Sequence, residues 1–308
     1  MPQERRRMVM TLLPTDWAAE WVRPTTPDFK MVGPVLTGPG KPLPADLEAF
    51  ITDAKAGKQG VLLASLGTIA ELDKEELASM AAAFATLPCK VLWRLTPKEV
   101  PDEAAVAALN LGPNTQAGRL PCQCLCLRSN ATGTVILAPD RLATCCTIFL
   151  RIKLAQSCSE RALGVQVVTW VPQNDILAHP NLRAFLSHVG INSMYEAIYH
   201  GKPIVGMPFF GDQPSNADRV VAKGLGLQLR PAQAGKPAFR EALVEVLSNQ
   251  KYAKAAKAMS VKIRARKNTP VQEAADWIEH VIATGGEPYL RTPENEMSLI
   301  VVEVKPAG

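Results

Sequence analysis

The chain has 308 residues, of which 47% are hydrophobic, and a formal net charge of +5. This length accommodates one or two domains with a large apolar core, and the 25 prolines argue against long uninterrupted helices. The positive charge alone is only a weak sign of an anionic partner. The longest apolar run near the end, residues 297–302, is far shorter than the ~20 residues that cross a bilayer, so the sequence shows no membrane span.

The first part of the chain lacks regular structure signals. Residues 1–45 are rich in Pro and Gly and show little periodicity, which predicts a linker-like segment. Their basic start is followed by too short an apolar stretch for a secretory signal. We expect a folded domain at residues 46–290 and a tail at residues 291–308.

From residue 61 onward, short apolar runs alternate with helical patterns, which predicts an α/β fold with a parallel sheet and helices on both faces. The predicted strands are residues 61–65, 90–95, 166–170, 184–187, 204–207 and 227–229. The predicted helices are residues 73–87, 192–200, 214–223, 237–249, 251–266 and 270–284. Asp73 and Glu76 have capping-box spacing at the start of the first helix, and Gly201 suits a left-handed cap after the second.

One internal block, residues 116–165, differs from the rest of the chain in composition. It holds six of the seven cysteines and a net charge of +4, which leaves +1 for the remainder. A metal site there would lack both CxxC spacing and a histidine. A disulfide knot would need an oxidising compartment, yet no signal peptide precedes it. We interpret the block as a non-native insertion, such as translated intron, that interrupts the domain.

Candidate binding residues lie where predicted strands end, because open parallel sheets bind ligands beyond the carboxyl ends of their strands. Ser65 and Thr68 follow the first strand, and Gly67 between them lets backbone N–H groups approach a phosphate. A strand-to-helix turn with a hydroxyl cap explains the same residues. Trp170 and Gln173 flank a proline turn, where an indole suits stacking on a base. The alternative for Trp170 is a core position under that turn.

The turn from His188 to Ser193 joins a strand to a helix. Gly190 permits a tight turn, and the helix N-terminus offers free N–H groups and positive potential to an anion. His188 and Ser193 add side-chain donors for a diphosphate. The alternatives are a helix cap at Asn192 and a histidine satisfied within the fold.

Three further polar residues follow in the chain. Glu196, eight residues after His188, suits a ribose because one carboxylate accepts from two hydroxyls; the alternative is favourable placement near a helix N-terminus. Asp212 and Gln213 follow the strand at 204–207 and suit the hydroxyls of a sugar. A surface turn is the alternative reading of that pair.

Taken in order, these residues resemble the signature of the UDP-glycosyltransferase family. The resemblance rests on WVPQND at 170–175, SHVGINS at 187–193, AIYHGKP at 197–203 and DQPSN at 212–216, and it is closest to animal-type members. It runs from about Phe29 to about Leu290 outside the block at 116–165. It covers only the second half of such an enzyme.

The resemblance implies the Rossmann-like, C-terminal donor-binding half of a GT-B glycosyltransferase. It assigns Trp170 and Gln173 to uracil, the turn at 188–193 to the diphosphate, Glu196 to ribose, and Asp212 with Gln213 to the sugar. It further implies inverting transfer of a hexose from a UDP-sugar to a hydroxyl of a small lipophilic acceptor. No metal, no cofactor beyond this co-substrate and no nucleic acid is expected.

In the family the general base is a histidine of the first half, so we name no catalytic residue and expect the isolated chain to be inactive. A donor-binding subunit that needs a separate acceptor-binding chain is an open alternative, as is a non-functional product disrupted by the inserted block. Animal-type relatives carry a membrane anchor further along. Membrane association is therefore expected only through segments outside this sequence, and the localisation stays undetermined.

Overall fold

The computed structural model describes residues 10–53, 60–67, 72–101, 103–109, 116–117 and 165–285. Within them, a seven-stranded sheet has the order β5-β6-β4-β3-β7-β8-β9, and every pair in it is parallel. The strands are β3 (Val61–Ser65), β4 (Lys90–Arg94), β5 (Gln116–Ala117), β6 (Val165–Val168), β7 (Leu182–Ser187), β8 (Ile204–Gly206) and β9 (Gly226–Gln228). The predicted parallel α/β sheet is confirmed.

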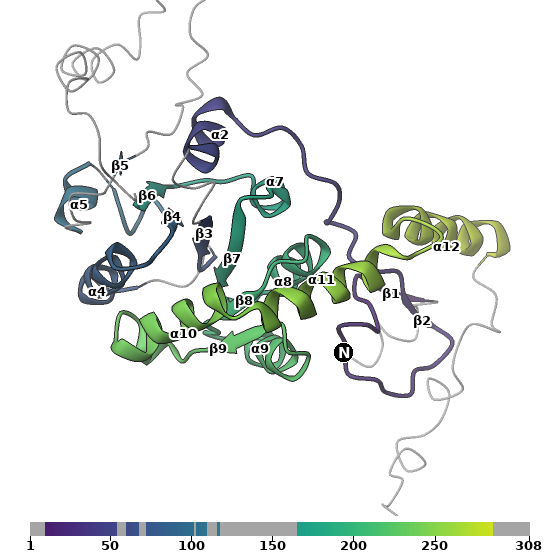
Figure 1. The fold of residues 1–308 in the computed structure, drawn as a ribbon. Helices are drawn as coiled ribbons and strands as arrows, with labels where there is room; N and C mark the ends of the chain where they lie inside the picture. Colours follow the sequence, from purple (N-terminus) through teal and green to yellow (C-terminus); the bar gives the residue numbers. More distant parts are fainter. Residues whose placement is uncertain are drawn as a thin grey trace, which may run out of the picture.

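Helices cover both faces of this sheet (Figure 1). The described helices are α2 (Ala45–Thr52), α4 (Lys74–Ala85), α5 (Glu103–Ala108), α7 (Gln173–Ala178), α8 (Ile191–Tyr199), α9 (Gln213–Ala222), α10 (Pro237–Ser248), α11 (Gln250–Arg264) and α12 (Pro270–Thr284). A 3-10 turn, η2 (Pro231–Gln233), precedes α10. None of these helices has the combination of length and apolarity that crossing a membrane requires.

The alternation of side chains along β3 divides the core in two. Leu62 and Ala64 face the cluster formed with α4 and α10, whereas Val61 and Leu63 face the cluster formed with α2, α7, α8, α9 and α11. Because β3 is buried on both faces, its first four residues are apolar, and only Ser65 at its end is polar. Packing in these two apolar clusters fixes the positions of the strand ends.

The local signals at helix ends also hold in the structure. Asp73 and Glu76 form both hydrogen bonds of the capping box at α4. Gly201 follows α8 with a φ of 64°, the left-handed conformation expected of a residue after a helix.

The N-terminal segment is more ordered than its linker-like composition indicates. It contains a parallel pair, β1 (Thr11–Leu13) and β2 (Phe29–Met31), and Figure 1 shows this pair beside α12 at one end of the molecule. Ala19 and Glu20 are buried against the domain. Most of the predicted insertion, residues 118–164, and the predicted tail lie outside the described residues, so both stay predictions.

Candidate functional site

The predicted site residues gather at the carboxyl ends of neighbouring strands. In the sheet order β3 lies between β4 and β7, and the connection from β3 runs to β4 on one side while β7 lies on the other. Open α/β sheets bind ligands at such a change of direction. Gly67 after β3 and His188 after β7 meet there, since a Cβ on Gly67 would lie 3.0 Å from Cε1 of His188.

The N-terminus of α8 opens onto this edge. Its cap is Gly190, which offers no side-chain acceptor, so the first-turn N–H groups have no side-chain cap. Together with the helix dipole, such N–H groups favour an anion. Asn192 is not the cap but the second residue of the helix, and it is exposed.

Gly190 is required for space rather than for a special backbone conformation. Its φ of −58° is open to any residue, and the left-handed residue of this turn is Val189, with a φ of 62°. A Cβ on Gly190 would lie 2.6 Å from Nε2 of His188, closer than atoms pack. The glycine therefore makes room for the imidazole, which corrects the prediction that it permits the tight turn.

His188 is half-buried and kept neutral by its surroundings. Burial lowers the pKa of its imidazole, and Arg94 adds to this, while the backbone of Ser65 and the Asp212 carboxylate act in the opposite direction. Its Nδ1 atom is buried without a hydrogen-bond partner. Buried polar atoms of this kind are rare in folded proteins, which marks His188 as a functional candidate.

Gln173, Ser193 and Glu196 form one hydrogen-bonded group between α7 and α8. Nε2 of Gln173 donates to Oγ of Ser193 at 3.0 Å and also to the carboxylate of Glu196. Burial raises the pKa of Glu196, and Asp175 raises it further, while the hydrogen bond from Gln173 lowers it. The carboxylate is thus oriented before any ligand arrives, and the side chain of Gln173 supports Glu196.

Trp170 follows β6 and is 62% exposed. This exposure excludes the alternative of a core tryptophan and leaves its ring free to stack. Ser65, by contrast, is a buried residue at the end of β3. Thr68 lies outside the described residues.

Asp212 and Gln213 differ in their surroundings. Asp212 is exposed at the start of α9, where one carboxylate oxygen accepts from Nδ2 of Asn216 at 2.7 Å. Gln213 is buried, and its Oε1 accepts from the backbone N–H of Phe209 at 2.8 Å. Asp212 is therefore available to a ligand, whereas the oxygen of Gln213 holds the loop before α9.

Arg94, the last residue of β4, belongs to the same edge. Its Nη1 donates to the carbonyl of Gly67 at 2.8 Å. Burial lowers the pKa of its guanidinium, an effect that Glu99 opposes. The available signal was a charged residue that directly follows three buried apolar residues of a strand.

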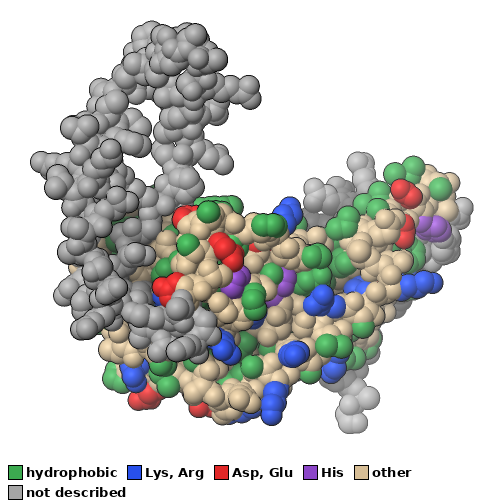
Figure 2. Space-filling model, turned by 45° about the horizontal axis from the view of Figure 1, so that its top comes forward, with side chains coloured by type: hydrophobic (Ala, Val, Ile, Leu, Met, Phe, Trp, Pro, Cys, Tyr) green, Lys and Arg blue, Asp and Glu red, His purple; other side chains and the backbone are tan. Residues whose placement is uncertain are grey.

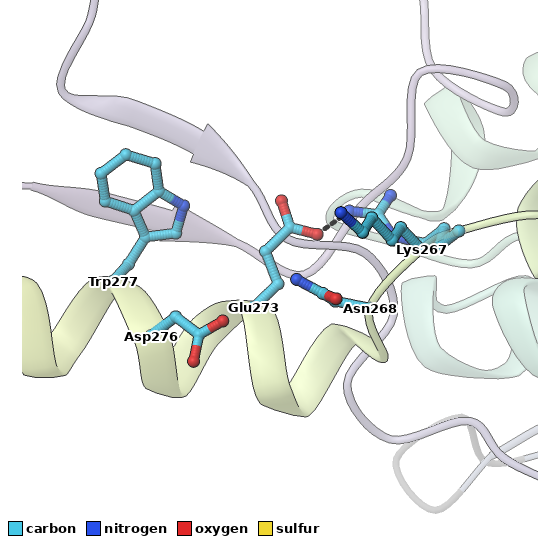
Figure 3. A pocket seen from close by; sticks show the side chains of 6 residues that line it. Lys267, Asn268, Glu273, Asp276 and Trp277 are labelled. Carbon is cyan, nitrogen blue, oxygen red and sulfur yellow. Dashed lines mark hydrogen bonds and ion pairs between the residues drawn. The ribbon is translucent and has the colours of Figure 1, made fainter.

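Figure 2 shows histidine side chains at the surface near the middle of one face, with acidic side chains beside them. A separate pocket of about 490 Å³ lies where α11 gives way to α12. It is lined by Arg266, Lys267, Asn268, Glu273, Asp276 and Trp277 (Figure 3). None of the predicted site residues lines it, and its arginine is bound to Asp16 and Glu273.

Comparison with known proteins shows the family of the chain. The family model "UDP-glucoronosyl and UDP-glucosyl transferase" matches residues 2–116 and 153–300. It therefore includes the linker-like segment and leaves residues 117–152 of the predicted insertion unmatched. UDP-glucuronosyltransferase 3A1 of Bos taurus is 33% identical over 279 residues, which are 90% of this chain and 42% of that protein. The 2-hydroxyacylsphingosine 1-beta-galactosyltransferase of Mus musculus is 31% identical over 93% of this chain and 42% of its own length.

Solved structures show the same fold. The calicheamicin glycosyltransferase CalG4 is 26% identical, with a TM-score of 0.52 over 84% of this chain and 50% of its own. Os79 from O. sativa, solved with U2F and trichothecene, is 19% identical, with a TM-score of 0.53 over 81% and 48%. The chain thus spans about half the length of the proteins it matches. It belongs to the UDP-glucoronosyl and UDP-glucosyl transferase family, matches the C-terminal half of its larger relatives, and has the α/β fold of GT-B glycosyltransferases.

Proposed function

We propose that this domain binds a UDP-sugar and presents its hexose for transfer to a hydroxyl group of a small lipophilic acceptor. The observation that carries the proposal is the meeting of four features at one sheet edge. These are the exposed ring of Trp170, the oriented carboxylate of Glu196, the N-terminus of α8 beside His188, and the exposed carboxylate of Asp212. In this assignment they contact uracil, ribose, diphosphate and sugar in turn.

The transfer step is a displacement at the anomeric carbon with inversion. The acceptor oxygen forms a bond to that carbon while the bond to the diphosphate oxygen breaks, and the electron pair leaves with UDP. The N-terminus of α8 and the nearby guanidinium of Arg94 stabilise the growing charge on the diphosphate, so the step needs no metal ion. The hexose assignment follows the names of the relatives, which include glucuronosyl and galactosyl transferases.

The proton of the acceptor hydroxyl requires a base on the opposite side of the sugar. His188 lies beside the helix N-terminus assigned to the diphosphate, the leaving-group side, so we do not assign it that role. We propose that the base belongs to an acceptor-binding half, supplied by more of the same polypeptide or by a partner chain. The 308-residue chain by itself is then expected to bind donor without transferring sugar, and turnover by this chain alone would contradict that assignment.

Thermal unfolding of the full chain tests donor binding. UDP-glucose or UDP-glucuronic acid should raise the melting temperature, because a ligand at one hundred times its Kd adds about 2.7 kcal/mol of stability. ADP-glucose serves as the control for non-specific diphosphate binding. His188→Ala and Glu196→Ala should each reduce the shift. The absence of any shift at millimolar UDP-sugar would exclude the donor site.

A further inference from the structure

A buried chain of hydrogen bonds runs from the proposed donor site to the N-terminal segment. It begins at Asn216 on α9, a polar residue that is only 1% exposed. Its Nδ2 donates to the carbonyl of Val189 at 2.9 Å and to the carboxylate of Asp212 at 2.7 Å. One side-chain amide therefore holds both the turn before α8 and the carboxylate assigned to the sugar.

The Val189 turn needs support of this kind. A valine with a φ of 62° is β-branched in the left-handed region, a conformation that costs on the order of 1–3 kcal/mol and persists only when its surroundings impose it. Its N–H donates to Oγ of Ser187 at 3.0 Å, and its carbonyl is held by Asn216. Its side chain is fully buried, and a Cβ on Gly206 would lie 2.7 Å from it. The backbone conformation that places His188 beside Gly190 is thus held by the hydrogen bonds and the packing of Val189.

The other end of the chain determines which way the amide of Asn216 points. Nη1 of Arg219 donates to Oδ1 of Asn216 at 2.9 Å and to the carboxylate of Glu20 at 2.8 Å. Because a guanidinium only donates, Oδ1 must face Arg219 and Nδ2 must face the site. Glu20 is buried in the N-terminal segment beside the hydroxyl of Tyr195, which itself lies on α8.

We propose that Asn216 is a positioning residue for the donor site, and that Glu20 and Arg219 hold its amide in the active orientation. Asn216 touches neither the base nor the ribose residues. It acts on the diphosphate turn through Val189 and on the sugar through Asp212. This inference rests on the proposed function, because it assumes that those two elements contact a UDP-sugar.

Asn216→Asp is the sharpest test in the full chain. It keeps the shape and the acceptor for Arg219, loses the donor to Val189, and brings a second carboxylate to Asp212. Val220→Ala is the control for lost packing on the same helix, because Val220 is fully buried four residues after Asn216 and its side chain makes no hydrogen bonds. Calorimetry with UDP and, separately, with uridine compares binding with and without the diphosphate.

We expect Asn216→Asp to weaken UDP binding by at least about tenfold, the cost of one buried hydrogen bond lost and one repulsion gained. Uridine affinity should stay within twofold, and Val220→Ala should leave both affinities within twofold even if it lowers the melting temperature. Glu20→Gln, at the remote end, should weaken UDP binding by at least threefold, and it serves as the test if Asn216→Asp does not fold.

Unchanged UDP affinity in Asn216→Asp would overturn the positioning role, because the substitution would then have no effect on the site. An equal loss of affinity for UDP and uridine would overturn it too, because it would mean that the substitution disturbs the whole domain. Wild-type chain that binds no UDP would instead refute the donor site itself. The two failures are therefore distinguishable.

Discussion

Replacing Gly190 with alanine separates the fold from the proposed site. The backbone at this position, with φ −58° and ψ 149°, accepts alanine without strain, and such a replacement stabilises a protein by ~0.4–1 kcal/mol through the unfolded chain. The new Cβ, however, would lie 2.6 Å from Nε2 of His188. The imidazole must move away from the start of α8, while the rest of the helix stays in place.

The expected loss is that of one hydrogen bond to a charged group, about 1.5–3 kcal/mol, or roughly 10- to 150-fold in UDP affinity. Calorimetry with UDP measures the affinity, and a thermal scan without ligand measures the fold. Gly38→Ala is the control, because a Cβ there meets nothing within 4 Å. Full UDP affinity in Gly190→Ala would refute the role of His188. A large drop in melting temperature without ligand would show that the glycine serves the fold instead.

Three further predictions test other parts of the account. Trp170→Ala should weaken the binding of UDP and of uridine equally, by the about 1–3 kcal/mol that stacking on a base contributes. The melting temperature should stay unchanged because the ring is 62% exposed. Unequal losses of affinity for the two ligands would place the ring away from the base. Burial, then Lys202 and Arg264, lower the pKa of His200 to about 4 from 6.5. Stability should therefore be unaffected above pH 6.5 and fall toward pH 4, by up to about 2 kcal/mol at pH 5. In denaturant titrations, His200→Asn should lose less stability than wild type when the pH falls to 5. An equal loss would mean that the pH dependence does not come from His200. Deleting residues 118–164 should leave UDP affinity within twofold, and abolished binding with an intact fold would contradict the predicted insertion.

Long or strongly patterned elements could be predicted from the sequence. β3 is a run of four buried apolar residues that ends in a buried serine, and α4 starts at a capping box, so both have physical signals that act over a few residues. Some short elements had no such signal. The helix α7 has six residues, too few to show a helical period, and β1 has three. Both depend on packing against distant parts of the chain.

The positions of the candidate site residues near strand ends could also be predicted, but several of their side-chain contacts could not. Gln173 reaches Glu196 across 23 residues of sequence, and Gln213 turns inward to hold a loop. Gly190 is small because His188 lies against it. Each of these depends on which side chains the fold brings together, and spacing along the chain carries no information about that. Asn216 shows the same limit, since one of its partners, the carbonyl of Val189, lies 27 residues away in the turn before α8.

The most direct test of the account is the amide spectrum of the labelled full chain during titration with UDP and, separately, with uridine. UDP should shift the backbone amides of Ile191, Asn192 and Ser193 at the start of α8 together with the indole of Trp170. Uridine, which lacks the diphosphate, should shift the indole and leave those three amides in place. If UDP leaves the three amides unmoved, the N-terminus of α8 does not hold the diphosphate and the proposed donor site is wrong.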